Sequence, residues 1–104
     1  MVKHIWGFYV PLEKQTEFER LNSPAGPWHR FFDGSPDFLG TYYLKSLETV
    51  LKDEQKAREY LTFDIWKSEE SFYKYIQQHK KEFNNLSEEN LELIIAKFHL
   101  GWFA

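Results

Sequence analysis

The stretch YLTFDIWKSEESF, residues 60–72, contains the end of one structural element and the start of the next. Residues 60–66 are rich in aromatic and branched side chains, which favour a β-strand. Ser68 is a typical helix N-cap residue, and Glu69 and Glu70 suit the positive end of a helix. The stretch therefore predicts a strand followed almost directly by a helix, with one acidic residue, Asp64, inside the strand.

This strand is predicted to be buried on both faces. Successive strand residues point to opposite sides, with Leu61, Phe63 and Ile65 on one face and Tyr60, Thr62, Asp64 and Trp66 on the other. A strand with one solvated face would alternate apolar and polar residues. Because large side chains occur on both faces, each face needs a cover.

Hydrophobic spacing, proline, glycine and capping residues predict the other elements. They are a strand over residues 2–10, a helix over 11–22, a short helix over 27–34, a strand over 38–46, a long exposed hairpin connection over 48–59 that could hold a helical turn, and a closing strand over 98–103. Gly40 is a possible bulge or point of close approach in the second strand. A buried stripe predicts a helix after Ser68, formed by Phe72, Ile76, His79, Phe83 and Leu86. Ser87 is predicted to cap a further helix.

This order of elements predicts one α+β domain over residues 1–104 with a ferredoxin-like βαββαβ arrangement. Such a fold has one antiparallel sheet with its helices on a single face. The simplest cover for the open face is the sheet of a second copy, which gives a homodimer in the form of a dimeric α/β barrel. Five residues are predicted to face the partner: Ile5, Tyr9, Leu61, Phe63 and Ile65.

Composition narrows the classes of function. Ten Phe, six Tyr and four Trp among 104 residues indicate that aromatic rings form much of the core, of a cavity or of an interface. A net charge of −3 with scattered basic residues argues against a nucleic-acid partner. The chain has no Cys, and no signal peptide or membrane span is evident, so we expect a cytoplasmic protein with no membrane partner.

A histidine and an acid are predicted to meet on the helix-facing side of the sheet. If the first and third strands are parallel neighbours, His4 and Trp6 lie beside Thr62 and Asp64. The carboxylate would then orient and charge the imidazole, which would take a proton from a phenol or quinol. The resulting anion can transfer an electron to oxygen, so the predicted chemistry needs no cofactor and no metal.

The candidate catalytic residues are His4, Asp64 and His79, and an aromatic small molecule is the predicted ligand. Its candidate binding residues are Trp6, Trp28, His29, Phe32, Thr62, Trp66 and Phe72. Structural roles remain open for these positions. A buried Asp often accepts hydrogen bonds that fix a loop, a terminal His is often half-exposed, and a His on an apolar helix stripe is often only packed.

Four blocks of sequence, GPWHRFF, PDFLGT, YLTFDIWKSEESF and LSEEN…LGWF, resemble blocks of the antibiotic biosynthesis monooxygenase superfamily. The resemblance covers nearly the whole chain and implies dimeric α/β barrels of ferredoxin-like protomers. It implies cofactor-independent oxygenation of aromatic compounds, with Trp66 matching a strand Trp near the substrate. Thr62 and Phe72 stand where some of these oxygenases carry an Asn and a second substrate-contacting aromatic residue.

Two other functions are open for a chain of this kind. One is a noncatalytic small-molecule-binding or stress-related protein on the same scaffold. The other is a heme-degrading monooxygenase, which requires His79 to face a cavity large enough for a porphyrin. Oxygenation, binding alone and heme degradation are unrelated functions that one fold can support, so the fold does not choose among them.

Overall fold

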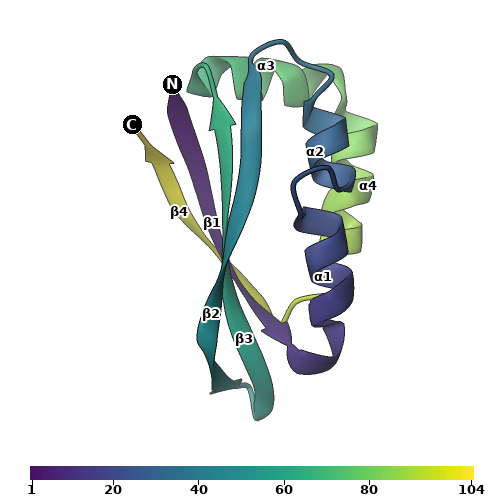
Figure 1. The fold of residues 1–104 in the computed structure, drawn as a ribbon. Coiled ribbons are helices and arrows are strands. Elements are labelled where there is room, and N and C mark those ends of the chain that lie inside the picture. The colour runs from purple at the N-terminus through teal and green to yellow at the C-terminus, as the bar shows by residue number, and fades with distance from the viewer.

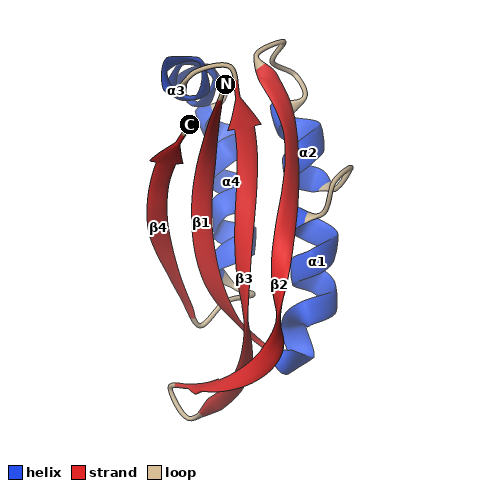
Figure 2. Ribbon diagram, turned by 60° about the vertical axis from the view of Figure 1, so that its left-hand side comes forward, coloured by secondary structure: helices blue, strands red, loops and turns tan.

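The computed structural model describes residues 1–104 as an α+β protein with one four-stranded antiparallel sheet and all helices on one face of it (Figures 1 and 2). In chain order the elements are β1 (Val2–Pro11), the 3-10 helix η1 (Leu12–Lys14), α1 (Gln15–Asn22), α2 (Pro27–Phe32), β2 (Phe38–Lys52), β3 (Gln55–Trp66), α3 (Glu69–Gln78), α4 (Lys80–Leu91) and β4 (Ala96–Phe103). The sheet order β2-β3-β1-β4 is compatible with the predicted ferredoxin-like arrangement.

The prediction that the first and third strands are parallel is wrong, because β1 and β3 pair antiparallel. The helices between β1 and β2 allow β2 to run parallel to β1, and the hairpin after β2 then makes β3 run in the opposite direction. The expected neighbours nevertheless coincide, with His4 opposite Asp64 and Trp6 opposite Thr62. The helix-facing side of these two strands therefore carries the residues that the sequence placed there.

The connection predicted over residues 48–59 is an exposed hairpin, as expected, but it has no helical turn and consists of regular strand. β2 and β3 continue through it as one long hairpin, joined at Asp53 and Glu54, whose positive φ angles of 49° and 65° are typical of a two-residue hairpin turn. The tip extends beyond the helices (Figure 2), so apolar side chains there stay in solvent and Leu51 is 73% exposed. Because neither face of this part of the hairpin is covered, its sequence lacks the alternation of apolar and polar residues that predicts a strand. The predicted bulge at Gly40 is confirmed by a register shift beside it.

The second half of the helical layer differs from its prediction. Ser68 does cap α3, because its hydroxyl accepts a hydrogen bond from the backbone N–H of Ser71 at 3.1 Å. The helix then breaks at His79, where φ is −133° and ψ is 39°, and α4 begins at Lys80. Ser87 lies inside α4 and caps nothing. Residues 80–91 therefore form one helix, which runs through Ser87 instead of ending before it.

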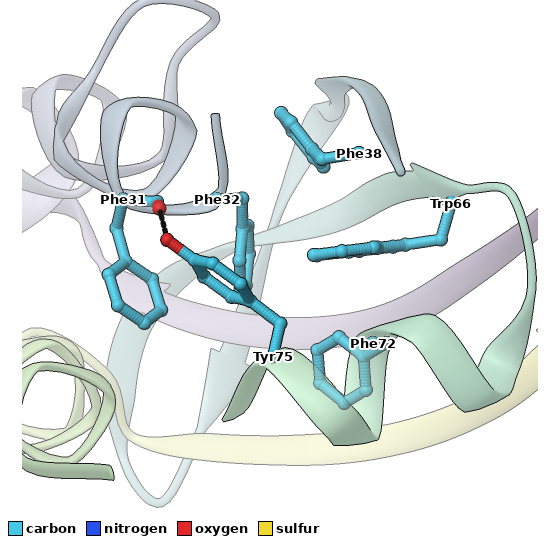
Figure 3. Close-up of a cluster of buried hydrophobic side chains, with 6 residues drawn as sticks. All are labelled: Phe31, Phe32, Phe38, Trp66, Phe72 and Tyr75. Atoms are coloured by element: carbon cyan, nitrogen blue, oxygen red, sulfur yellow. Dashed lines mark hydrogen bonds between the residues drawn. The ribbon is translucent and has the colours of Figure 1, made fainter. Parts of the chain in front are cut away.

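Two clusters of buried rings lie between the sheet and the helices. The larger cluster (Figure 3) contains Phe31, Phe32, Phe38, Trp66, Phe72 and Tyr75. The Tyr75 hydroxyl donates a hydrogen bond to the Phe31 carbonyl at 2.6 Å, which ties α3 to α2. The smaller cluster contains Phe8, Val10, Phe18 and Tyr60. Aromatic residues thus form most of the core, as the composition indicated.

The other face of the sheet carries no covering element (Figure 1). It nevertheless presents large side chains, because Leu61, Phe63 and Ile65 are only half-buried there and Tyr42 is exposed. The rings of Tyr42 and Phe63 stack in parallel across β2 and β3, with centroids 4.6 Å apart. Within one chain, this face is an open aromatic and aliphatic surface. None of the helices has both the length and the apolar character needed to span a membrane.

Candidate functional site

A cavity of about 420 Å³ lies between the sheet and the helices. The sheet contributes His4, Trp6, Phe8, Thr41, Thr62, Asp64, Lys97 and His99. The helices contribute Asn22, Trp28, Phe32, Phe72, Tyr73, Ile76, Phe83, Ser87, Asn90 and Leu91. This volume lies within the usual range for small-molecule sites, and the combination of ring walls with a few polar groups is typical of them. We call it the central cavity.

His4 is hydrogen-bonded to another histidine. Its Nε2 lies 2.8 Å from Nε2 of His99, so one ring donates and the other accepts. The His4 ring also stacks on Trp102, with centroids 4.0 Å apart and an angle of 4° between the planes. Burial, together with the neighbouring His99, lowers the pKa of His4 to about 4. His4 is therefore neutral at neutral pH, which is the opposite of the charged imidazole that the sequence suggested.

Asp64 shares the central cavity with His4, but the two are not hydrogen-bonded to each other. Thr41, on the neighbouring strand, donates its hydroxyl to Asp64 Oδ1 at 2.8 Å. Burial raises the pKa of Asp64 to about 6, and the Thr41 hydrogen bond opposes this rise. Oδ2 forms no hydrogen bond within the chain, so it is available to a ligand in the cavity. At neutral pH, Asp64 is a carboxylate of unusually high basicity.

The structure brings together most, but not all, of the predicted site residues. Trp6, Trp28, Phe32, Thr62 and Phe72 line the central cavity with His4 and Asp64.

Three predicted residues lie elsewhere. Trp66 is fully buried in the larger core cluster. His29 packs against the ring of Phe38, and its buried Nδ1 has no hydrogen-bond partner. His79 lies at the break between α3 and α4, with its ring 4.3 Å from that of Tyr75, and borders a separate, more polar pocket.

Sequence reasoning missed several polar residues of the cavity. His99 and Thr41 are the hydrogen-bond partners of His4 and Asp64, and Asn22 and Asn90 face them from the helical layer. Thr41 and His99 were detectable in principle, because each lies on the strand next to its partner's strand. Their identification required the correct register, including the shift in β4 beside His99. The two asparagines gave no signal, because they are 68 positions apart.

The site contains no cluster of three His, Asp or Glu side chains that would hold a metal ion. Lys97 is the cation of the cavity lining, with its amino group 5.4 Å from the centre of the Trp6 ring. Fold and site together define a small α+β protein with an aromatic sheet–helix cavity that contains one carboxylate and one histidine pair. No family model matches the chain, and no curated protein matches it significantly.

The raised pKa of Asp64 makes stability depend on pH. The unfolded chain loses this proton near pH 4 and the folded chain near pH 6, so the acid's contribution to the free energy of unfolding falls as pH rises through that interval. Asp64→Asn removes the titration but keeps an oxygen for Thr41. We expect this variant to gain about 1–3 kcal/mol over wild type between pH 4 and pH 7.

Urea unfolding of both proteins at pH 4, 5, 6 and 7 measures this gain. Asp33→Asn changes an exposed acid and serves as the matched control. A constant difference between wild type and Asp64→Asn across the interval would contradict the raised pKa.

Proposed function

We propose that this chain binds a flat aromatic molecule with acidic hydroxyl or benzylic hydrogens in the central cavity and oxygenates it with O₂, without a cofactor. The observation that carries this proposal is the Asp64 carboxylate, which stands among aromatic walls with one oxygen held by Thr41 and the other free. Rings at positions 6, 28 and 72 provide surfaces for stacking a planar ligand.

Asp64 acts as the general base in this proposal. A base works best when its pKa is close to the working pH, and burial has raised the pKa of Asp64 to about 6. His4, with a pKa of about 4, is a much weaker base and serves instead as a neutral hydrogen-bonding group that pairs with His99. The neutral His4 imidazole adds no charge to the cavity.

The proposed reaction can be followed for an anthrone-type substrate, which carries a CH₂ group between two aromatic rings. Asp64 takes one proton, and the carbanion reduces O₂ by one electron. The two radicals then combine to form a C–O bond, and the proton returns to the outer oxygen to give a hydroperoxide. Loss of the second C–H proton with cleavage of the O–O bond releases water and leaves a carbonyl. One oxygen atom enters the product and the other becomes water.

The functional unit that we propose is a homodimer. A second copy covers the open sheet face of the first, which joins two antiparallel sheets into a dimeric α/β barrel. The exposed stack of Tyr42 and Phe63 supports this proposal, since such surfaces mark interaction sites. The resemblance to the antibiotic biosynthesis monooxygenase superfamily supports both the dimer and the oxygenation.

A second candidate function is ligand binding without catalysis. The observation in its favour is the hydrogen bond from Thr41 to Asp64, because an acid with a dedicated partner also serves a purely structural role. Heme degradation has no comparable support. It requires His79 in a large cavity, and His79 lies outside the central cavity.

Oxygen uptake with a panel of quinols and anthrones, measured on the purified protein with an oxygen electrode, tests the proposed activity. We expect turnover with at least one substrate and a loss of about hundredfold in Asp64→Asn, a typical contribution of a general base. Asp33→Asn is the control and retains wild-type turnover. Binding of these compounds without oxygen uptake would establish the noncatalytic function instead.

A further inference from the structure

A pair of buried asparagines forms part of the helix wall of the central cavity. Asn22 is the last residue of α1, and Asn90 is near the end of α4. They are only 8% and 7% exposed, and both line the cavity. Polar side chains buried to this degree normally have all their hydrogen-bonding groups paired.

The orientation of both amides follows from their partners. Asn22 donates from Nδ2 to the Phe18 carbonyl at 3.0 Å, and a carbonyl only accepts, so the nitrogen of Asn22 must be on this side. The same nitrogen lies 2.9 Å from Asn90 and uses its second hydrogen there, so the atom it meets must be the oxygen of Asn90. The backbone therefore fixes Asn22, and Asn22 fixes Asn90.

Two amide atoms are left over by this arrangement. Asn90 Nδ2 has two hydrogens and Asn22 Oδ1 has lone pairs, and neither atom forms a hydrogen bond within the chain. Neither atom is sealed from solvent. Because the two residues are otherwise buried and both line the central cavity, the space that these atoms reach is the cavity.

We infer that Asn90, held in place by Asn22, is a recognition residue for a ligand carbonyl, and that the ligand is an aromatic ketone or quinone rather than a simple phenol or hydrocarbon. The free amide hydrogens of Asn90 donate to the carbonyl oxygen. Asn22 Oδ1 accepts from a hydroxyl where the ligand has one beside the carbonyl. An unpaired donor in a buried wall disfavours an apolar surface placed against it, so the same group rejects rings without oxygen.

The inference rests on the proposed function only in locating the ligand in the central cavity. It adds which chemical group of the ligand faces the helices. The sheet wall holds Asp64 and the histidine pair, whereas the helix wall holds the two asparagines. A ligand that satisfies both walls has an acidic hydrogen toward the sheet and a carbonyl toward the helices, a combination that anthrone-type ketones possess.

A matched pair of soluble ligands tests the inference through binding alone. Anthraquinone-2-sulfonate and anthracene-2-sulfonate share ring size and charge and differ in the two carbonyl groups. We expect calorimetric titration of wild type at pH 8 to show about tenfold tighter binding of the quinone, the usual effect of one hydrogen bond. Equal affinities, or binding of neither compound, would overturn the inference, and this comparison needs no variant.

The variant Asn90→Asp tests whether Asn90 causes the tighter binding of the quinone. The aspartate oxygen still accepts from Asn22, but the free donor becomes an acceptor that repels a carbonyl, so we expect the preference for the quinone to disappear. Asn85→Asp adds the same charge on the exposed side of α4 and is expected to keep it. A preference retained in Asn90→Asp would overturn the assignment. Carbonyl-dependent binding without oxygen uptake would refute the oxygenation alone, whereas uptake without this preference would refute the carbonyl site alone.

Discussion

Trp66→Ala is expected to lower the free energy of unfolding by about 3–5 kcal/mol, the usual range for removal of a buried Trp. The side chain has no exposed surface. Its ring packs against Phe32 and Phe38, each with a centroid distance of 5.3 Å, and against Phe72 at 5.5 Å (Figure 3). Removal leaves a large cavity among rigid rings, which relax little around it.

Urea unfolding, followed by circular dichroism, measures this loss. Trp66→Phe is the matched control, because it keeps a ring and removes an Nε1 that has no hydrogen-bond partner. We expect the control to lose about 1–2 kcal/mol and to bind ligands of the central cavity as wild type does. A small loss of stability in Trp66→Ala would contradict the core role, whereas a weaker ligand affinity in Trp66→Phe would show that Trp66 also serves the site.

The sheet was predictable where each strand had a covered face. Residues 60–66 alternate between Leu61, Phe63 and Ile65 on one side and a more mixed set with Tyr60 and Trp66 on the other, and they occupy the two sides of β3 as expected. Residues 48–59 lacked such a pattern, because the hairpin tip extends beyond the helices. The direction of β3 follows from the hairpin between β2 and β3, because a hairpin reverses the chain.

The part of the site that was predictable is the set of strand residues that face the helices, because side chains alternate between the two faces of a strand. His4 and Asp64 lie opposite each other and line one cavity, as alternation and neighbouring strands indicated. Their hydrogen-bond partners were not predictable, because each depends on the register of a further strand and on a bulge. His79 was placed on the inner stripe of one long helix, but the helix breaks at that residue and turns its ring toward Tyr75.

Phe63→Glu is expected to dissociate the proposed dimer. Phe63 lies near the centre of the open sheet face and stacks on Tyr42. In the dimer, a carboxylate at this position would be buried without a partner, which costs several kcal/mol. A cost of about 3 kcal/mol raises a dissociation constant by more than hundredfold. We therefore expect wild type to be a dimer and the variant to be a monomer at micromolar concentration.

Size-exclusion chromatography with light scattering distinguishes the two states, and circular dichroism shows whether the variant is folded. Phe63 is half-buried in the single chain and faces away from both core clusters, so a folded monomer is the expected product. Lys74→Glu introduces a carboxylate on the exposed side of α3 and is expected to remain dimeric. A monomeric wild type, or a Phe63→Glu variant that stays dimeric, would exclude this face as the interface. The large side chains of Leu61 and Ile65 would then need another cover, since a single chain leaves that face of the sheet open.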